Sequence, residues 1–157
     1  MAPINLMPIA TKSDKIDLSS EKKTEELAIK FLKKLKLGTT VFLYGEMGVG
    51  KTTFIRYLIN GFQKINELNI TEVTSPTFNL LNEYQINQTK INHYDLFRLK
   101  SVEEIKNLDL FGDNLRAITL IEWPQLIKKK PKNLIELIFE YGKGHQTRFV
   151  QIKGLNL

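Results

Sequence analysis

The sequence predicts one α/β domain in which helices flank a mixed central sheet, with parallel strands in the core and antiparallel hairpins outside it. An apolar, β-rich segment at 40–44 leads through a glycine-rich loop into a segment with the apolar spacing of a helix. Two further pairs of strand-like segments are each joined by a short polar or glycine-containing turn, which is typical of antiparallel hairpins. The chain has 157 residues, enough for one domain with a core but not comfortably for two.

The first 72 residues are expected to contain a helix, a strand and a second helix. Residues 1–14 are expected to form an irregular N-terminal segment, and 15–157 the domain itself. Ser19 or Ser20 can cap a helix that ends at Gly38. The apolar face of this helix consists of Leu27, Ala28, Phe31, Leu32 and Leu35. A strand at 40–44 and a helix to about residue 62 follow, and 63–72 is polar and loop-like.

The remainder of the chain contains most of the expected strands. These are 79–86, 90–97, 116–121, 134–141 and 146–152, of which the first two and the last two are expected to form hairpins. Ser101 and Glu104 have the spacing of a capping box that opens a short helix. Glu122 ends the most apolar strand, and Pro124 suits the first turn of a further helix.

Composition excludes several classes of protein. Hydrophobic residues make up 42% of the chain and charged residues 25%, as in ordinary globular domains. No apolar run approaches the roughly 18 residues that cross a bilayer, and the N-terminus lacks a secretory signal pattern. The chain has no cysteine and 2 histidines, which excludes disulfides, thiolate ligands and a histidine-based zinc site. We therefore expect a cytoplasmic protein without a membrane partner.

Residues 45–52, Gly-Glu-Met-Gly-Val-Gly-Lys-Thr, match the phosphate-binding pattern G-x-x-x-x-G-K-[ST] at every fixed position. Backbone N–H groups of the loop and the positive end of the following helix would bind phosphates. Lys51 would contact the β- and γ-phosphates, and the Thr52 hydroxyl would bind Mg²⁺. The predicted nucleotide-binding residues are Glu46, Met47, Gly48, Val49, Gly50, Lys51, Thr52 and Thr53. The sequence thus predicts a P-loop NTPase-like domain that binds a nucleoside triphosphate with Mg²⁺.

Hydrolysis or transfer requires groups beyond the phosphate loop. Glu122 ends the most apolar strand, where ligand crevices open in α/β sheets, and Asp95 lies within the expected strand 90–97. Either could instead be a surface or capping carboxylate. Thr77 lies after a proline in a polar segment, where it could sense a γ-phosphate or simply follow a turn. By residue type alone, His93 is expected to be structural and Trp123 to lie in the core.

Two short matches to the motifs of guanine-nucleotide-binding proteins are interpreted as chance. Residues 11–14 fit the guanine motif N/T-K-x-D, and residues 109–112 fit D-x-x-G, but neither ends an apolar strand, so adenine is the expected base. The net charge of +6 and the lysine-rich run at 128–132 are compatible with contact to RNA, phosphate or an acidic partner. A solvated loop is the simpler interpretation of the lysine run.

Four motifs together resemble the bacterial TsaE family, formerly the YjeE ATPases, over about residues 19–148. They are the phosphate loop, Ser75-Pro76-Thr77-Phe78, His93-Tyr94-Asp95-Leu96-Phe97-Arg98-Leu99 and Ile121-Glu122-Trp123-Pro124. Many families share the phosphate loop, whereas the combination is specific to this one. The resemblance implies a Mg²⁺-dependent ATPase of tRNA threonylcarbamoyladenosine biosynthesis. Its implied partners are the proteins TsaD and TsaB, which modify the adenosine beside the anticodon, with tRNA reached only through that complex.

The resemblance also implies roles for individual residues. The implied catalytic residues are Lys51, Asp95, Glu122 and Thr77, and the implied metal ligands are Thr52 and Glu122. Asp95 would act near the metal or the attacking water, and Thr77 would be a switch threonine. Trp123 would be a functional position, and Ser19–Thr24 would lie near the base. Hydrolysis by the isolated protein is expected to be slow and to rise with the partners.

Two other functions remain open on the sequence. A small P-loop metabolite kinase would need an acceptor pocket and usually an arginine-bearing lid, and no arginine-rich insertion appears. A nucleotide-dependent switch or adaptor with negligible turnover is the second alternative, and the presence of two candidate acids argues against it.

Overall fold

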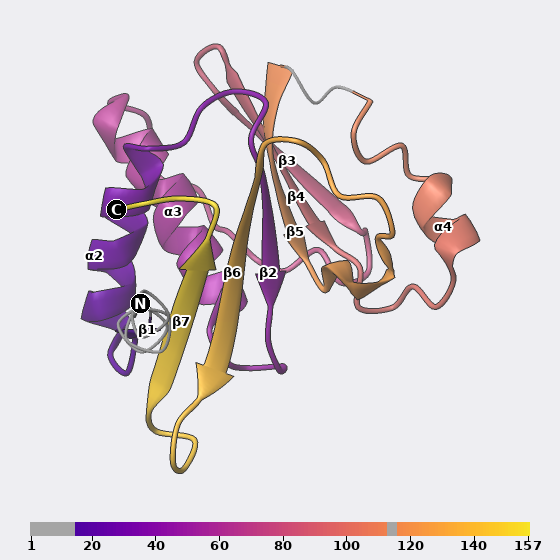
Figure 1. The fold of residues 1–157 in the computed structure, drawn as a ribbon. Coiled ribbons are helices and arrows are strands. Elements are labelled where there is room, and N and C mark those ends of the chain that lie inside the picture. The colour runs from indigo at the N-terminus through magenta and orange to yellow at the C-terminus, as the bar shows by residue number, and fades with distance from the viewer. Residues whose placement is uncertain (1–14, 113–115) are drawn as a thin grey trace, which may run out of the picture.

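The computed structural model describes residues 15–112 and 116–157, which form a seven-stranded mixed sheet with helices on both faces (Figure 1). The strands are β1 (Lys15–Asp17), β2 (Thr40–Tyr44), β3 (Leu81–Ile86), β4 (Thr89–Asp95), β5 (Ala117–Glu122), β6 (Leu134–Tyr141) and β7 (Arg148–Lys153). Their order in the sheet is β1-β7-β6-β2-β5-β4-β3. The four central strands β6, β2, β5 and β4 are parallel, and the outer strands pair antiparallel. This is the fold class that the sequence predicts.

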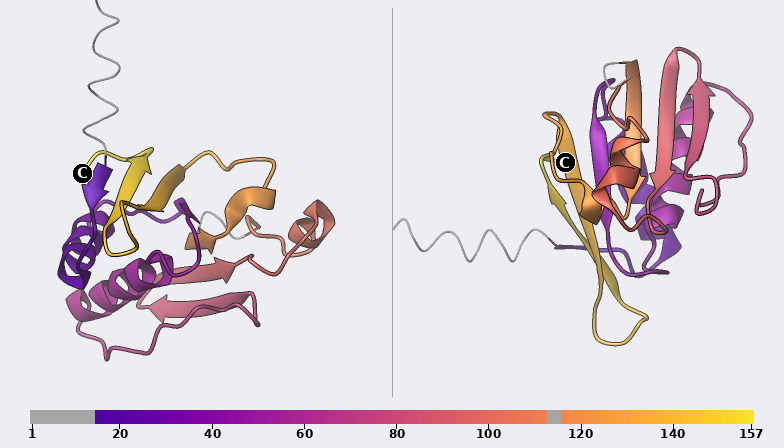
Figure 2. Two further views of the ribbon diagram at one scale, coloured as in Figure 1. Left: turned by 90° about the horizontal axis from the view of Figure 1, so that it is seen from below. Right: turned by 90° about the vertical axis from the view of Figure 1, so that its right-hand side faces the viewer.

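Two long helices cover one face of the sheet and short elements cover the other. Helices α2 (Glu21–Leu32) and α3 (Lys51–Ile65) pack on each other and on the sheet. Helix α4 (Val102–Lys106) and the 3₁₀ turn η3 (Pro124–Leu126) belong to the core of the opposite face. The right-hand view of Figure 2 shows α4 in front of the sheet and α3 behind it. The two faces of the sheet therefore differ in what covers them.

The alternation of side chains along β2 divides the interior into two cores. Val41 and Leu43 face α2 and α3, whereas Phe42 faces α4. In the larger core, the ring of Phe54 from α3 lies 5.4 Å from that of Phe31 and 6.0 Å from that of Phe139. Through these ring contacts, the start of α3 packs against both α2 and β6.

Several expected boundaries differ from the structure. Lys15–Asp17 forms β1 against β7, which periodicity could not reveal because the strand has only 3 residues. Pro124 begins only a 3₁₀ turn rather than a helix, since the backbone is extended again at Ile127. Ser20, not Ser19, caps α2 by accepting from the backbone N–H of Lys23, and α2 ends at Leu32, before Gly38.

Other sequence expectations agree with the structure or lie outside it. The capping box of Ser101 and Glu104 is present at the start of α4. The expected irregular segment 1–14 and the pattern at 11–14 lie outside the described residues. No helix within 15–112 and 116–157 is both long and apolar enough to span a membrane.

We expect Phe54→Ala to lower the free energy of unfolding by about 3–5 kcal/mol, because it removes a fully buried ring that contacts two others. Phe54→Leu, which keeps most of the volume, should cost roughly 1 kcal/mol. Urea unfolding followed by circular dichroism measures both. Equal losses for the two variants would contradict the packing role assigned to the ring.

Candidate functional site

The phosphate loop lies between the carboxyl end of β2 and the start of α3. Gly45 has a φ of +146°, which favours glycine over other residues. A Cβ added at Gly45 would lie 2.8 Å from Val49 Cγ1 and 2.9 Å from the carbonyl oxygen of Phe139. Both the backbone conformation and the close approach of β6 therefore require glycine at the first position of the motif.

The start of α3 is available to an anion. Gly50 occupies the N-cap position with a φ of +119°, so no side chain caps the helix, and the first turn contains no acidic residue. The N–H groups of a helix's first turn lack partners within the helix, and they carry the positive end of its dipole. This end of α3 has the features of a phosphate-binding site.

Lys51 is buried beneath the loop, with 5% of its surface exposed. Its ammonium group donates to the carbonyl oxygens of Gly45 and Glu46 and lies 4.1 Å from the centroid of the Trp123 ring. Burial lowers the pKa of Lys51, and nearby carboxylates partly oppose this shift. A bound anion would favour the charged form further.

Asp95 and Glu122 lie next to each other at the ends of β4 and β5. The two residues are partners in the parallel register of these strands, and Glu122 is also opposite Leu43 at the end of β2. Both side chains are almost fully buried, at 3% and 2% exposure. The Thr52 hydroxyl, in the first turn of α3, donates to Glu122 Oε1 at 2.7 Å. The structure thus brings the phosphate loop and both predicted acids together.

Asp95 holds the segment that contains Thr77. The hydroxyls of Ser75 and Thr77 both donate to Asp95 Oδ2, the second at 3.0 Å, and the two hydroxyl oxygens are 3.0 Å apart. Asp95 Oδ1 accepts from the backbone N–H of Phe97 at 3.0 Å. Sequence reasoning assigned no role to Ser75, although its position two residues before Thr77 was visible in the motif.

His93 lies behind Glu122, inside the core. Its side chain is fully buried, and its Nε2 is 3.5 Å from Glu122 Oε1. Within the described part of the chain, neither ring nitrogen has a hydrogen-bond partner. His93 does not line the cavity between the loop and the acids. Its position agrees with the structural role expected from the sequence.

Trp123 has a strained backbone at the edge of the site. Its φ of 59° and ψ of 57° are left-handed, a conformation that costs a residue with a Cβ roughly 1 kcal/mol. The ring is half-buried and lies 4.9 Å from the Phe97 ring. Such strain concentrates at functional sites. The expectation from residue type, a core position, is incomplete because the ring also forms a wall of the site.

Two hollows adjoin the loop on either side. One, of about 240 Å³, is lined by Met47, Gly48, Gly50, Lys51, Thr52, Thr53, Ser75, Thr77, Asp95, Phe97, Glu122 and Trp123. The other, of about 270 Å³, includes Ser19, Ser20, Glu21 and Thr24, together with Gln146 and Arg148. The predicted neighbourhood of the base therefore adjoins the loop, and sequence reasoning missed Gln146 and Arg148.

The pattern at 109–112 lies far from the phosphate loop in the fold. It belongs to the connection between α4 and β5, and its first three residues line a cavity on the opposite face of the sheet from α3. This position agrees with the interpretation of the match as incidental.

Comparisons with known proteins agree on one family. A family model described as "Threonylcarbamoyl adenosine biosynthesis protein TsaE" matches residues 18–150. The tRNA threonylcarbamoyladenosine biosynthesis protein TsaE of Rickettsia bellii is 45% identical over 121 residues, covering 76% of this chain and 81% of that protein. The protein of the same name from Borreliella burgdorferi is 37% identical over 145 residues, covering 88% and 98%.

A solved structure has the same fold. The crystal structure of YdiB from Bacillus matches with a TM-score of 0.65 at 20% sequence identity, covering 90% of this chain and 86% of that one. At this identity the match supports the architecture of the sheet and helices.

We expect Gly45→Ala to destabilise the protein by roughly 2–4 kcal/mol, because the new methyl group meets backbone and side-chain atoms at a left-handed φ. Gly144→Ala is the matched control, since Gly144 has a φ of +70° but open space around its Cβ position. The control should cost only roughly 1 kcal/mol. Thermal unfolding compares the two, and a control as damaging as Gly45→Ala would refute the steric argument.

Proposed function

We propose, because the chain belongs to the TsaE family, that it is the Mg²⁺-dependent ATPase of tRNA threonylcarbamoyladenosine biosynthesis and acts in the cytoplasm with the TsaD–TsaB pair. One observation carries the proposal for the site. The phosphate-loop residues Lys51 and Thr52 lie against Asp95 and Glu122, which end adjacent parallel strands. Phosphate-binding groups and carboxylates in one crevice are the components that hydrolysis of a nucleoside triphosphate requires.

The chain's own groups would bind and orient the triphosphate. The free N–H groups at the start of α3 would hold the phosphates, and Lys51 would exchange its contacts with loop carbonyls for phosphate oxygens. Lys51 is little exposed, so its charge would act with little screening by water. The ring of Trp123 lies over this ammonium group and would limit the access of water to it.

The residues beside the loop suit Mg²⁺. Thr52 and Glu122 offer a hydroxyl and a carboxylate oxygen, the hard donors that Mg²⁺ prefers, already 2.7 Å apart. Among the described residues no group of three or more His, Cys, Asp or Glu could hold a metal. Phosphate oxygens and water would complete the ligand set. Bound Mg²⁺ supplies positive charge that neutralises the phosphate oxygens.

Asp95 and Thr77 would change their contacts according to whether a γ-phosphate is bound. The carboxylate of Asp95 now accepts from Ser75, Thr77 and the backbone of Phe97. We infer that a γ-phosphate competes for the Thr77 hydroxyl. Asp95 Oδ2 would keep its bond from Ser75 but gain room for one further hydrogen bond, from the attacking water. Phe78, the next residue, is 83% exposed, so movement of this segment would alter a partner-facing surface.

The second hollow would receive the base. It lies on the α2 side of the loop, and Thr53 and Gly50 line both hollows, so a nucleotide could extend from one to the other around the start of α3. Arg148 and Gln146, from β7 and the turn before it, would contribute polar groups beside Ser19–Thr24.

The kinase alternative finds little support. A metabolite kinase must hold its acceptor beside the γ-phosphate. The largest cavity that we describe lies across the sheet from α3, where it cannot present an acceptor to the loop.

We expect purified protein with Mg²⁺ to hydrolyse ATP slowly and to be stimulated when the TsaD–TsaB pair is added. Lys51→Ala should abolish turnover, and Glu122→Gln should lower stimulated turnover at least about 100-fold by removing the anionic ligand. Phosphate release measures the rate. Undiminished hydrolysis by Glu122→Gln would remove Glu122 from the mechanism, and turnover indifferent to TsaD–TsaB would refute the partner assignment.

Thr77→Val should separate nucleotide binding from switching. The substitution keeps the shape of the side chain but removes the hydroxyl that Asp95 now binds. We expect ATP affinity to change by less than about threefold. Binding to TsaD–TsaB should lose its dependence on ATP, as measured by interferometry with ATP and with ADP. Retained ATP dependence would show that Thr77 is not the switch.

A further inference from the structure

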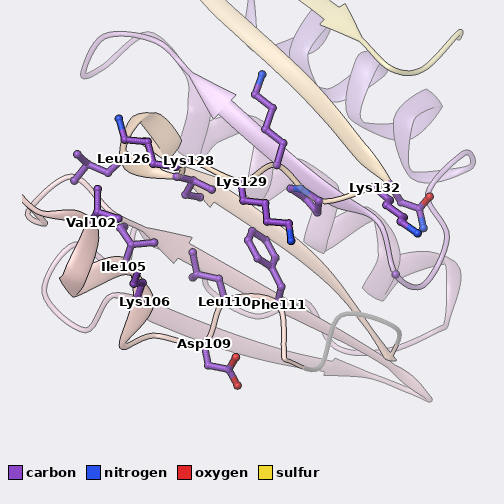
Figure 3. A pocket seen from close by; sticks show the side chains of 15 residues that line it. Val102, Ile105, Lys106, Asp109, Leu110, Phe111, Leu126, Lys128, Lys129 and Lys132 are labelled. Carbon is purple, nitrogen blue, oxygen red and sulfur yellow. The ribbon is translucent and has the colours of Figure 1, made fainter.

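A cavity of about 600 Å³ lies on the sheet face opposite to α3, and the nucleotide-site proposal does not use it (Figure 3). It lies between α4 with the segment that follows it and the segment 126–133, which leads into β6. We call it the basic groove. The sheet separates it from the phosphate loop, so both sites could be occupied at once.

The floor of the basic groove is apolar. Val102, Ile105, Leu110 and Phe111 project into it from one side, and Leu126 comes from the other (Figure 3). Ile105 and Leu110 are buried in the smaller core, whereas Val102 and Phe111 remain partly exposed. An apolar side chain inserted here would therefore displace water from surface that the fold leaves uncovered.

The rim of the basic groove carries a positive charge that the fold does not neutralise. The rim lysines are Lys106, Lys128, Lys129, Lys130 and Lys132. Among the described residues only Lys130 of these forms an ion pair, with Glu136 at 3.1 Å. Asp109 is the one acidic residue among the described residues that line the groove, and Figure 3 shows its carboxylate pointing away from the labelled lysines. An occupant of the groove should therefore be anionic.

We propose that the basic groove docks an acidic, amphipathic segment of a partner protein. Its apolar side chains would enter the floor, and its carboxylates would lie against the lysines of the rim. This occupant satisfies both features of the groove at once, and recognition by apolar anchors within a charged rim is usual in protein interfaces. The inference does not depend on the ATPase proposal, since no rim or floor residue belongs to the nucleotide site.

Other occupants fit less well. RNA would match the charge, but it has no aliphatic groups for the floor. In the described part of the lining, Phe111 is the one aromatic residue on which a base could stack. A second copy of this chain would bring a net charge of +6 to an already basic surface.

The experiment uses fluorescence anisotropy with the full chain and three labelled probes. The first is a peptide of about four helical turns with Leu and Phe at i, i+3 and i+4 spacing and Asp or Glu elsewhere. The second has Ala at the apolar positions and the same charge, and the third is a single-stranded RNA of similar length. We expect the first probe to bind at least about tenfold more tightly than the other two.

Variants locate the binding. Lys128→Glu combined with Lys129→Glu should weaken binding of the first probe at least about tenfold, as should Phe111→Ser, without changing ATP hydrolysis. The matched control combines Lys30→Glu with Lys143→Glu, which reverses the same number of exposed lysines away from the groove. The control should weaken binding by less than about twofold.

Three results would overturn the proposal. They are equal binding of the apolar and alanine peptides, equal losses in the groove pair and the control pair, and tighter groove-dependent binding of the RNA. The lysine pair is exposed and keeps the test valid if Phe111→Ser fails to fold. Because we expect the groove variants to hydrolyse ATP at the normal rate, failure of the docking proposal could be distinguished from failure of the ATPase proposal.

Discussion

The parallel register of β2, β5 and β4 is the constraint on which the candidate site depends. Parallel neighbours end at the same edge of a sheet, so Leu43, Glu122 and Asp95 arrive side by side although they are distant in the sequence. The phosphate loop leaves β2 at this edge, and α3 returns across the sheet with Thr52 in its first turn. The hydrogen bond between Thr52 and Glu122 therefore results from strand pairing.

The charged side chains of the candidate site are buried, so each needs a partner within the protein. Lys51, Asp95 and Glu122 are each exposed by 5% or less, and removing charged groups from water is costly unless they are paired or hydrogen-bonded. Carbonyl groups satisfy the lysine, and hydroxyl and N–H donors satisfy the acids. Because the fold fixes these groups at one edge of the sheet, a bound triphosphate would meet them already in place. Binding would exchange the contacts of Lys51 and Thr77 without moving the strands.

Most of the fold could be predicted because its signals are local. The glycine spacing of the loop, the apolar strand before Glu122 and the capping box at Ser101 each depend on a few neighbouring residues. The strand β1, the left-handed backbone of Trp123 and the link from Ser75 to Asp95 depend on contacts between distant segments, which a single sequence does not display. The lysine run at 128–132 could be recognised by its charge, but most of the apolar floor beside it comes from α4 and the segment after it, about twenty residues earlier.

The junction of β1 and β7 has a consequence for folding during synthesis. The backbone N–H of Leu18 donates to the Arg148 carbonyl, and the Arg148 N–H donates to the Ser19 hydroxyl, so this wall of the second hollow joins residues about 130 positions apart. β6 must also pair with β2 beside the loop. In a growing chain the second hollow would thus stay incomplete until β7 leaves the ribosome. The proposed binding of the base in this hollow would therefore have to wait until β7 has been synthesised and has paired.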